Sequence, residues 1–233
     1  MISDHLNIER ALSGTMAVDT LGPEEKEFCV KYRPVFEIGR MAGHMARGYY
    51  AYRAAITVAR DPRANSLVTT EAGSNQTNPV GHVTRKDGTG HVYDILSYLD
   101  NARTNPEVLR DLERIWIVGS LIAIGDALDK RKYLNHLPLF ELVRHLRTGV
   151  AHGNAFDIRY PDTLRKYPAH NRQAPIKNAV FEIKPDLDGR PVLFEFMGAA
   201  DVLDLLMSIE SYLTYIRRLV KLGELDSLLQ AIA

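Results

Sequence analysis

The stretch PLFELVRHLRTGVAHGN, residues 138–154, decides the fold prediction because it contains one complete amphipathic helix. Its apolar residues fall on one face at about 100° per residue: Leu139, Leu142, Val143, Leu146 and Val150. A second set falls on the opposite face: Glu141, His145, Thr148 and His152. Proline at the start and Gly153-Asn154 at the end are typical helix boundaries, so the stretch predicts a helix over 138–152.

Similar patterns on both sides of this stretch predict further helices. A short helix is expected at 92–102, and Asn105-Pro106-Glu107 is typical of the start of a helix that runs over 106–130. Residues 199–222 form a long helix with a broad apolar stripe: Val202, Leu205, Leu206, Ile209, Leu213, Ile216 and Val220. Residues 24–60 are predicted to be helical with an interruption near Pro34, because proline lacks the backbone donor that a helix interior needs.

The remaining stretches lack helical periodicity. Residues 61–90 contain SNQTNPVGH and KDGTG and are predicted to be a long polar loop, for which disorder is slightly favoured over a function. Residues 155–177 are predicted to be irregular. The segment AVFEIKPDLDGRPVLFEF predicts a β-hairpin, with strands over 180–184 and 192–196 and a turn at Asp188-Gly189.

Together these patterns predict a mainly α-helical bundle with a small β-hairpin insertion, in a single domain over 1–233. The composition, 45% apolar and 25% charged, is ordinary for a globular protein. The single cysteine, Cys29, excludes an internal disulfide and a cysteine-rich zinc site. The N-terminus does not resemble a signal peptide, and the longest apolar stretch, 115–125, is too short to cross a bilayer. We therefore expect a soluble cytoplasmic protein without a membrane partner.

The charge distribution argues against a general nucleic-acid coat protein, which is usually basic, because the formal net charge is zero. Any contact with nucleic acid must then be local. Three arginines recur at seven-residue spacing, Arg33, Arg40 and Arg47, and Arg53 and Arg60 continue the series approximately. Such a basic helical face can follow phosphates, although a solvated face is the commoner meaning.

The richest cluster of reactive side chains lies within the opening stretch: Arg144, His145, Arg147 and His152. A guanidinium grips phosphate and keeps its charge, whereas an imidazole exchanges a proton near neutral pH. This combination suits phosphodiester cleavage in which a neighbouring hydroxyl attacks phosphorus. The simpler interpretation is that positive side chains complement the dipole at a helix C-terminus.

The geometry of Arg147 and His152 poses a difficulty. At five residues apart they point about 140° away from each other on a regular helix. Either the helix unwinds near Gly149, or a second chain supplies its own copies and the site is built across a two-fold interface.

Residues 147–152, RTGVAH, resemble the R-x4-6-H motif of the HEPN superfamily (higher eukaryotes and prokaryotes nucleotide-binding domains). The resemblance covers roughly residues 92–222. It implies a helical bundle and a homodimer that cleaves RNA without a metal or cofactor, leaving a 2′,3′-cyclic phosphate and a 5′-hydroxyl. Arg147 and His152 match the catalytic pair, and Thr148 stands where the family often has asparagine. Arg144 and His145 are expected to bind substrate beside Thr148.

The same resemblance implies a toxin–antitoxin or antiviral defence role, with an inhibitor or antitoxin protein as a potential partner. An alternative is a non-catalytic HEPN-like module for nucleotide binding, protein interaction or dimerisation. A third interpretation is a helical scaffold in which Arg147 and His152 only balance charge. Glu141, His145 and His152 share a helix face, but no metal-ligand motif contains them, so a solvated or interface polar face is favoured over a metal site.

Overall fold

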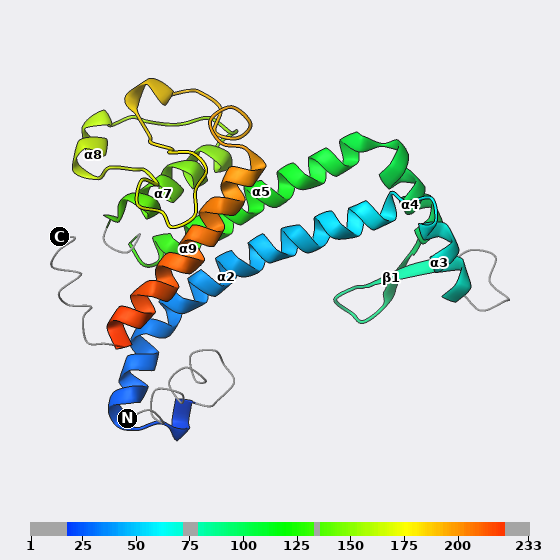
Figure 1. Ribbon diagram of the computed structural model, residues 1–233, viewed down its shortest axis with the longest axis horizontal. Helices are drawn as coiled ribbons and strands as arrows, with labels where there is room; N and C mark the ends of the chain where they lie inside the picture. Colours follow the sequence, from blue (N-terminus) through cyan, green and yellow to red (C-terminus); the bar gives the residue numbers. More distant parts are fainter. Residues whose placement is uncertain (1–17, 72–78, 133–135, 222–233) are drawn as a thin grey trace. The chain divides into compact units, whose positions relative to one another are not determined.

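A computed structural model describes residues 18–71, 79–132 and 136–221, and this part of the chain is mainly helical with a small antiparallel sheet (Figure 1). Its α-helices are α2 (Pro23–Ala59), α3 (Ala64–Glu71), α4 (Ile95–Thr104), α5 (Pro106–Asp129), α7 (Pro138–Ala151), α8 (Pro161–Lys166) and α9 (Ala199–Lys221). Two short 3-10 helices are η1 (Val18–Thr20) and η2 (Pro185–Leu187). Parts of the predicted N-terminal helical region and polar loop, residues 1–17 and 72–78, lie outside the described residues.

The chain divides into two compact units, one made of residues 1–46 and 117–233 and the other of residues 47–116. The first therefore contains α7, α8 and α9, and the second contains α3, α4 and the sheet. Helices α2 and α5 each contribute residues to both units. The single domain expected over 1–233 stays a prediction.

Helix α7 lies at the centre of the first unit. All the apolar residues of its predicted face are buried, and Phe140 is fully enclosed beside them. Helix α9 packs against α7 through an edge-to-face contact between Tyr212 and Phe140, with ring centroids 5.7 Å apart. Helix α9 also contributes buried residues from Val202 to Leu213, whereas the side chains of Ile216 and Val220 lie outside the described ones. The helices predicted at 106–130, 138–152 and 199–222 are confirmed to within a residue.

The predicted interruption near Pro34 is wrong, because α2 continues through that residue. A proline in a helix interior costs about 3 kcal/mol. Burial of the next turns offsets this cost, since Ile38, Ala42 and Ala46 all belong to the core. Gly39 lies so close to α9 that an added Cβ would meet Leu213 Cβ at 3.1 Å.

The predicted location of the β-hairpin is also wrong. The hairpin pairs β1 (Val80–Thr84) with β2 (Gly90–Asp94), within the stretch expected to be a polar loop and the start of a helix. Its turn is formed at Asp87-Gly88, where Gly88 has a φ of 85° and the Asp87 carboxylate accepts a hydrogen bond from the Thr89 amide at 3.0 Å.

Residues 180–196 form a folded loop whose contacts replace strand pairing. Val192 and Leu193 are buried, and the Phe181 and Phe196 rings meet at 5.4 Å. Asp188, expected in a hairpin turn, instead accepts a hydrogen bond from the Ile158 amide at 2.7 Å. The alternating apolar pattern therefore reflects a loop packed on the core.

Among the described residues, no helix combines the length and apolar character that a membrane crossing requires.

Candidate functional site

An open groove of about 430 Å³ lies along the C-terminal half of α7. Predicted site residues line one side of it: Arg144, His145 and His152. The other side consists of residues from the chain that follows α7: Asp157, Ile158, Arg159, Tyr160 and Thr163. Arg147 and Thr148 are not part of this lining, so the groove unites some of the predicted residues and separates others. We call it the histidine groove.

The end of α7 is fixed by local backbone chemistry. Gly153 and Asn154 adopt φ values of 92° and 65°, so the predicted helix-ending signal is confirmed. The Asn154 side chain accepts from the Leu193 amide at 2.8 Å and donates to its carbonyl at 3.2 Å. Gly149 stays helical and lets the loop approach, since a Cβ there would lie 2.3 Å from Val192 Cγ2. The proposed unwinding at Gly149 therefore does not occur.

His152 caps α7 and is exposed to solvent. Its Nδ1 lies 2.8 Å from the main-chain carbonyl oxygen of Thr148. A carbonyl only accepts, so Nδ1 carries the proton and Nε2 of the neutral ring holds a lone pair. Within the described part of the chain, Nε2 forms no hydrogen bond. Thr148 thus contributes to the site through its backbone, by orienting an imidazole that can accept a proton.

Arg147 points to a different neighbour. Its Nε donates to Asp126 Oδ1 at 2.8 Å, and a terminal nitrogen lies 2.6 Å from the same oxygen. Gly125 makes this approach of α7 to α5 possible, because a Cβ there would lie 2.4 Å from Arg147 Cγ. The Arg147 and Asp126 side chains are 33% and 47% exposed. A pair this open is worth about 1 kcal/mol or less, so a competing anion can displace the carboxylate.

A buried carboxylate, Glu141, pairs with Arg144 of the histidine groove. The Glu141 side chain has no exposed surface, which corrects its expected place on a solvated polar face. Its oxygens accept from Arg144 Nε and His136 Nδ1, both at 2.6 Å. The His136 ring is stacked on Tyr167, with centroids 3.9 Å apart. The ion pair with Glu141 fixes the direction of the Arg144 guanidinium.

His145 is held neutral by its surroundings. Burial lowers its pKa to about 4, and the adjacent Arg144 charge acts in the same direction. A terminal nitrogen of Arg144 lies 3.1 Å from His145 Nε2. Because a guanidinium only donates, this nitrogen of His145 accepts. His145 therefore serves as a neutral hydrogen-bonding group at physiological pH, and His152 is the more accessible proton acceptor.

Sequence reasoning missed the opposite wall of the groove. Arg159 forms a two-pronged ion pair with Asp157, at 2.9 Å from Nε and 2.8 Å from a terminal nitrogen. Tyr160 is 76% exposed beside it. The signal was available in DIRYP, residues 157–161, where an arginine and an aromatic residue closely follow the R-x4-H stretch. An exposed aromatic ring beside arginines is suited to stacking a nucleic-acid base.

The groove offers groups for acid–base chemistry and anion binding. Within the part of the chain that the structure describes, histidine, cysteine and acidic side chains form no cluster that could hold a metal ion. Comparison of the chain with models of known protein families, with curated proteins and with solved structures gave no match. The candidate site therefore depends on its own geometry.

Proposed function

We propose that this protein is a metal-independent endoribonuclease of the HEPN type that cleaves RNA beside His152. The observation that supports this best is the orientation of His152. Its Nδ1 is held by the Thr148 carbonyl, and its Nε2, which no described residue contacts by a hydrogen bond, lies at the edge of a groove lined by Arg144. The HEPN-like bundle, the cytoplasmic location and the defence role with an antitoxin belong to the same proposal, on the strength of the RTGVAH stretch.

In the proposed reaction, His152 Nε2 takes the proton from a ribose 2′-hydroxyl as its oxygen attacks the adjacent phosphorus. The bond from phosphorus to the 5′-oxygen breaks, and that oxygen leaves as a hydroxyl after taking a proton from water, while His152 returns its own proton to solvent. The products are a 2′,3′-cyclic phosphate and a 5′-hydroxyl. An arginine stabilises the charge that builds on the phosphoryl oxygens.

Arg147 fills this last role most simply from a second copy of the chain. In one chain the Arg147 guanidinium lies on Asp126 of α5, whereas His152 borders the histidine groove. A homodimer with a two-fold axis near the end of α7 places each Arg147 toward the other chain's groove. The weak, half-exposed pair with Asp126 leaves the guanidinium free to exchange its carboxylate for a phosphate.

A non-catalytic nucleotide-binding or dimerisation module is the second candidate. One observation favours it: the arginines around the groove are already paired, Arg144 with Glu141 and Arg159 with Asp157. Such a groove offers less net positive charge to a developing transition state than unpaired arginines do.

The test is incubation of the purified protein with a mixed single-stranded RNA, with and without EDTA, followed by analysis of the product ends. We expect cleavage that EDTA does not affect and fragments that end in a 2′,3′-cyclic phosphate. Binding without cleavage on every RNA tried establishes the second candidate instead. Cleavage abolished by EDTA contradicts the metal-independent reaction.

A further inference from the structure

A second polar groove, separate from the histidine groove, lies within the unit formed by residues 47–116. It has a volume of about 180 Å³ and lies between the end of α2 and the start of α5, lined by Tyr52, Arg53, Ile56, Arg60, Pro106, Leu109, Arg110 and Glu113. On α2, Arg53, Ile56 and Arg60 follow helical spacing, which puts them on one face. We call this the arginine groove.

Two guanidinium groups of this groove have no partner among the described residues. Arg60 and Arg110 are exposed, and neither side chain forms an ion pair or hydrogen bond with any other described residue. Glu113 is the only acid in the lining and is already engaged by Arg53, with Oε1 3.2 Å from a terminal nitrogen. Three arginines thus face one carboxylate, so this groove is locally basic in a chain whose formal net charge is zero.

The third arginine, Arg53, contacts both Glu113 and Tyr49. Tyr49 is buried, packs against Trp116 with the two rings tilted and their centroids 4.7 Å apart, and donates its hydroxyl to Glu113. The same terminal nitrogen of Arg53 approaches the Tyr49 oxygen at 3.4 Å. Both contacts use one nitrogen of Arg53, so its other donors remain directed elsewhere. The Arg53 side chain is 59% exposed, so this guanidinium can turn toward an anion in the groove.

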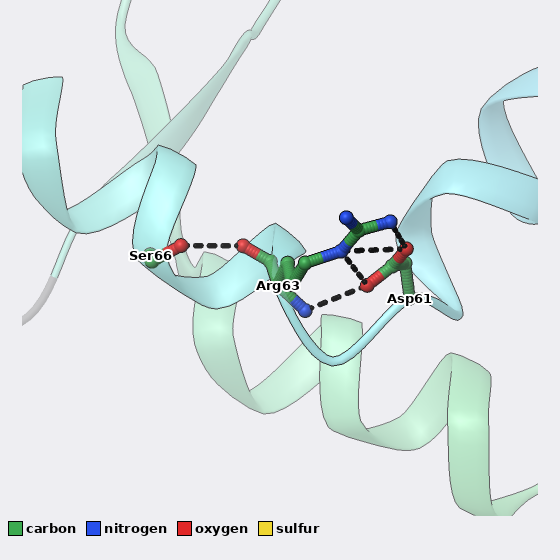
Figure 2. Close-up of polar contacts among 3 residues, drawn as sticks. All are labelled: Asp61, Arg63 and Ser66. Carbon is green, nitrogen blue, oxygen red and sulfur yellow. Dashed lines mark hydrogen bonds and ion pairs between the residues drawn. The ribbon is translucent and has the colours of Figure 1, made fainter.

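Arg63, in the turn after α2, provides a contrast, because an ion pair with Asp61 neutralises its charge. Figure 2 shows its guanidinium lying along the Asp61 carboxylate, at 2.7 Å from a terminal nitrogen and 3.0 Å from Nε. The Arg63 amide also donates to Asp61 at 2.8 Å, and its carbonyl accepts from the Ser66 hydroxyl at 2.7 Å. Arg63 carries the same charge as Arg60, but the Asp61 carboxylate neutralises it.

We propose that the arginine groove binds adjacent phosphates of a single RNA strand, as a docking site for the substrate of the proposed nuclease. Unpaired guanidiniums are the groups that best grip phosphate oxygens. The groove is too small to enclose a nucleotide, because small-molecule pockets measure about 300 Å³ or more. It therefore suits a backbone that passes along the surface. No histidine or nucleophile lines it, so it binds without chemistry.

This inference rests on the proposed function for its choice of ligand, and it is tested independently of cleavage. The probe is a 2′-O-methyl RNA oligonucleotide, which a 2′-hydroxyl mechanism cannot cut. Its binding is measured by fluorescence anisotropy over a range of salt concentrations. The test variant is Arg60→Gln/Arg110→Gln, and the matched control is Arg63→Gln. Circular dichroism melting checks that each variant is folded.

We expect the double variant to bind roughly tenfold more weakly for each arginine removed, the effect of a lost hydrogen bond from a charged group. The slope of log K against log salt should become shallower by about 1.4, because about two phosphate contacts are lost. Arg63→Gln should leave both the affinity and the slope unchanged. Inorganic diphosphate should compete weakly with RNA for wild type and not at all for the double variant.

Equal binding by wild type and the double variant overturns the proposal. An equal loss in Arg63→Gln also overturns it, since the effect would then be general charge. Binding of diphosphate without binding of RNA would contradict the proposal that the ligand of this groove is RNA. If RNA binds through Arg60 and Arg110 but unmodified RNA is never cut, the docking site stands and the proposed nuclease fails.

Discussion

The histidine groove and the arginine groove differ in which of their groups are left unpaired. In the histidine groove, Arg144 and Arg159 are matched by carboxylates, and the free group is Nε2 of His152. In the arginine groove, Arg60 and Arg110 have no partner among the described residues, and the lining contains no imidazole. Free guanidiniums hold an anion, whereas a free imidazole exchanges a proton. In the two proposals above, the arginine groove therefore binds RNA and the histidine groove carries out the chemistry.

The largest effect in a test of these two roles is expected from substitution of His152. His152→Ala removes the proton acceptor, so the rate of RNA cleavage should fall roughly a hundred- to ten-thousandfold. Binding of the 2′-O-methyl oligonucleotide should stay at the wild-type level, because the arginine groove is intact. His44→Ala, at an exposed histidine of α2, is the matched control and should cleave normally. A His152→Ala protein that cleaves as fast as wild type removes this residue from the mechanism.

The next effect concerns the stability of the histidine groove. Glu141→Gln leaves Arg144 without its counter-ion and gives His136 a poorer acceptor. We expect the free energy of unfolding to fall by about 2 kcal/mol or more, as measured by urea denaturation. Glu195→Gln, at an exposed position, should have no measurable effect. Equal stability of Glu141→Gln and wild type would show that the buried carboxylate does not organise this wall.

The pH dependence of stability should also separate the two grooves. Burial lowers the pKa of His145 from 6.5 to about 4, so between these values the unfolded chain binds more protons than the folded one. Stability is therefore complete above pH 6.5 and falls as the pH drops toward 4. The slope from this group is at most about 1.4 kcal/mol per pH unit.

This pH effect is measured by urea denaturation of wild type and His145→Gln at intervals between pH 4.5 and 7.5, a window set by the lowered pKa of His145. The curve of the variant should be flatter, and the two should converge in slope above pH 7. Identical slopes throughout would mean that His145 titrates normally in the folded state. Affinity of the arginine groove for the 2′-O-methyl oligonucleotide should change little over this range, because guanidiniums stay charged.

Long helices were predictable because their apolar faces repeat over several turns. The face of α7 from Leu139 to Val150 is buried as expected. The hairpin was not predictable in the same way. Asp87-Gly88 and Asp188-Gly189 offer the same turn signal, and only the second has strongly apolar flanks. Those flanks are apolar because the loop packs on the core, whereas β1 and β2 are largely exposed.

The residue types of the candidate site were predictable from the sequence, but the partner of each side chain was less so. The spacing of Arg147 and His152 already indicated that the two side chains diverge, and α7 is helical through Ala151. The sequence did not reveal that Asp126 pairs with Arg147, because that contact depends on how α5 crosses α7 at Gly125. The burial of Glu141 was equally hidden, since its partner His136 comes from the segment before α7.

The central claim is that His152 and Arg147 act in one site supplied by two chains. The most direct test mixes Arg147→Ala with His152→Ala after each is shown to be folded, dimeric and inactive. In a mixed dimer one site keeps both residues and the other loses both. Random exchange of subunits should therefore restore about a quarter of the wild-type cleavage rate. A mixture that stays as inactive as its components, although mixed dimers have formed, would contradict the shared site.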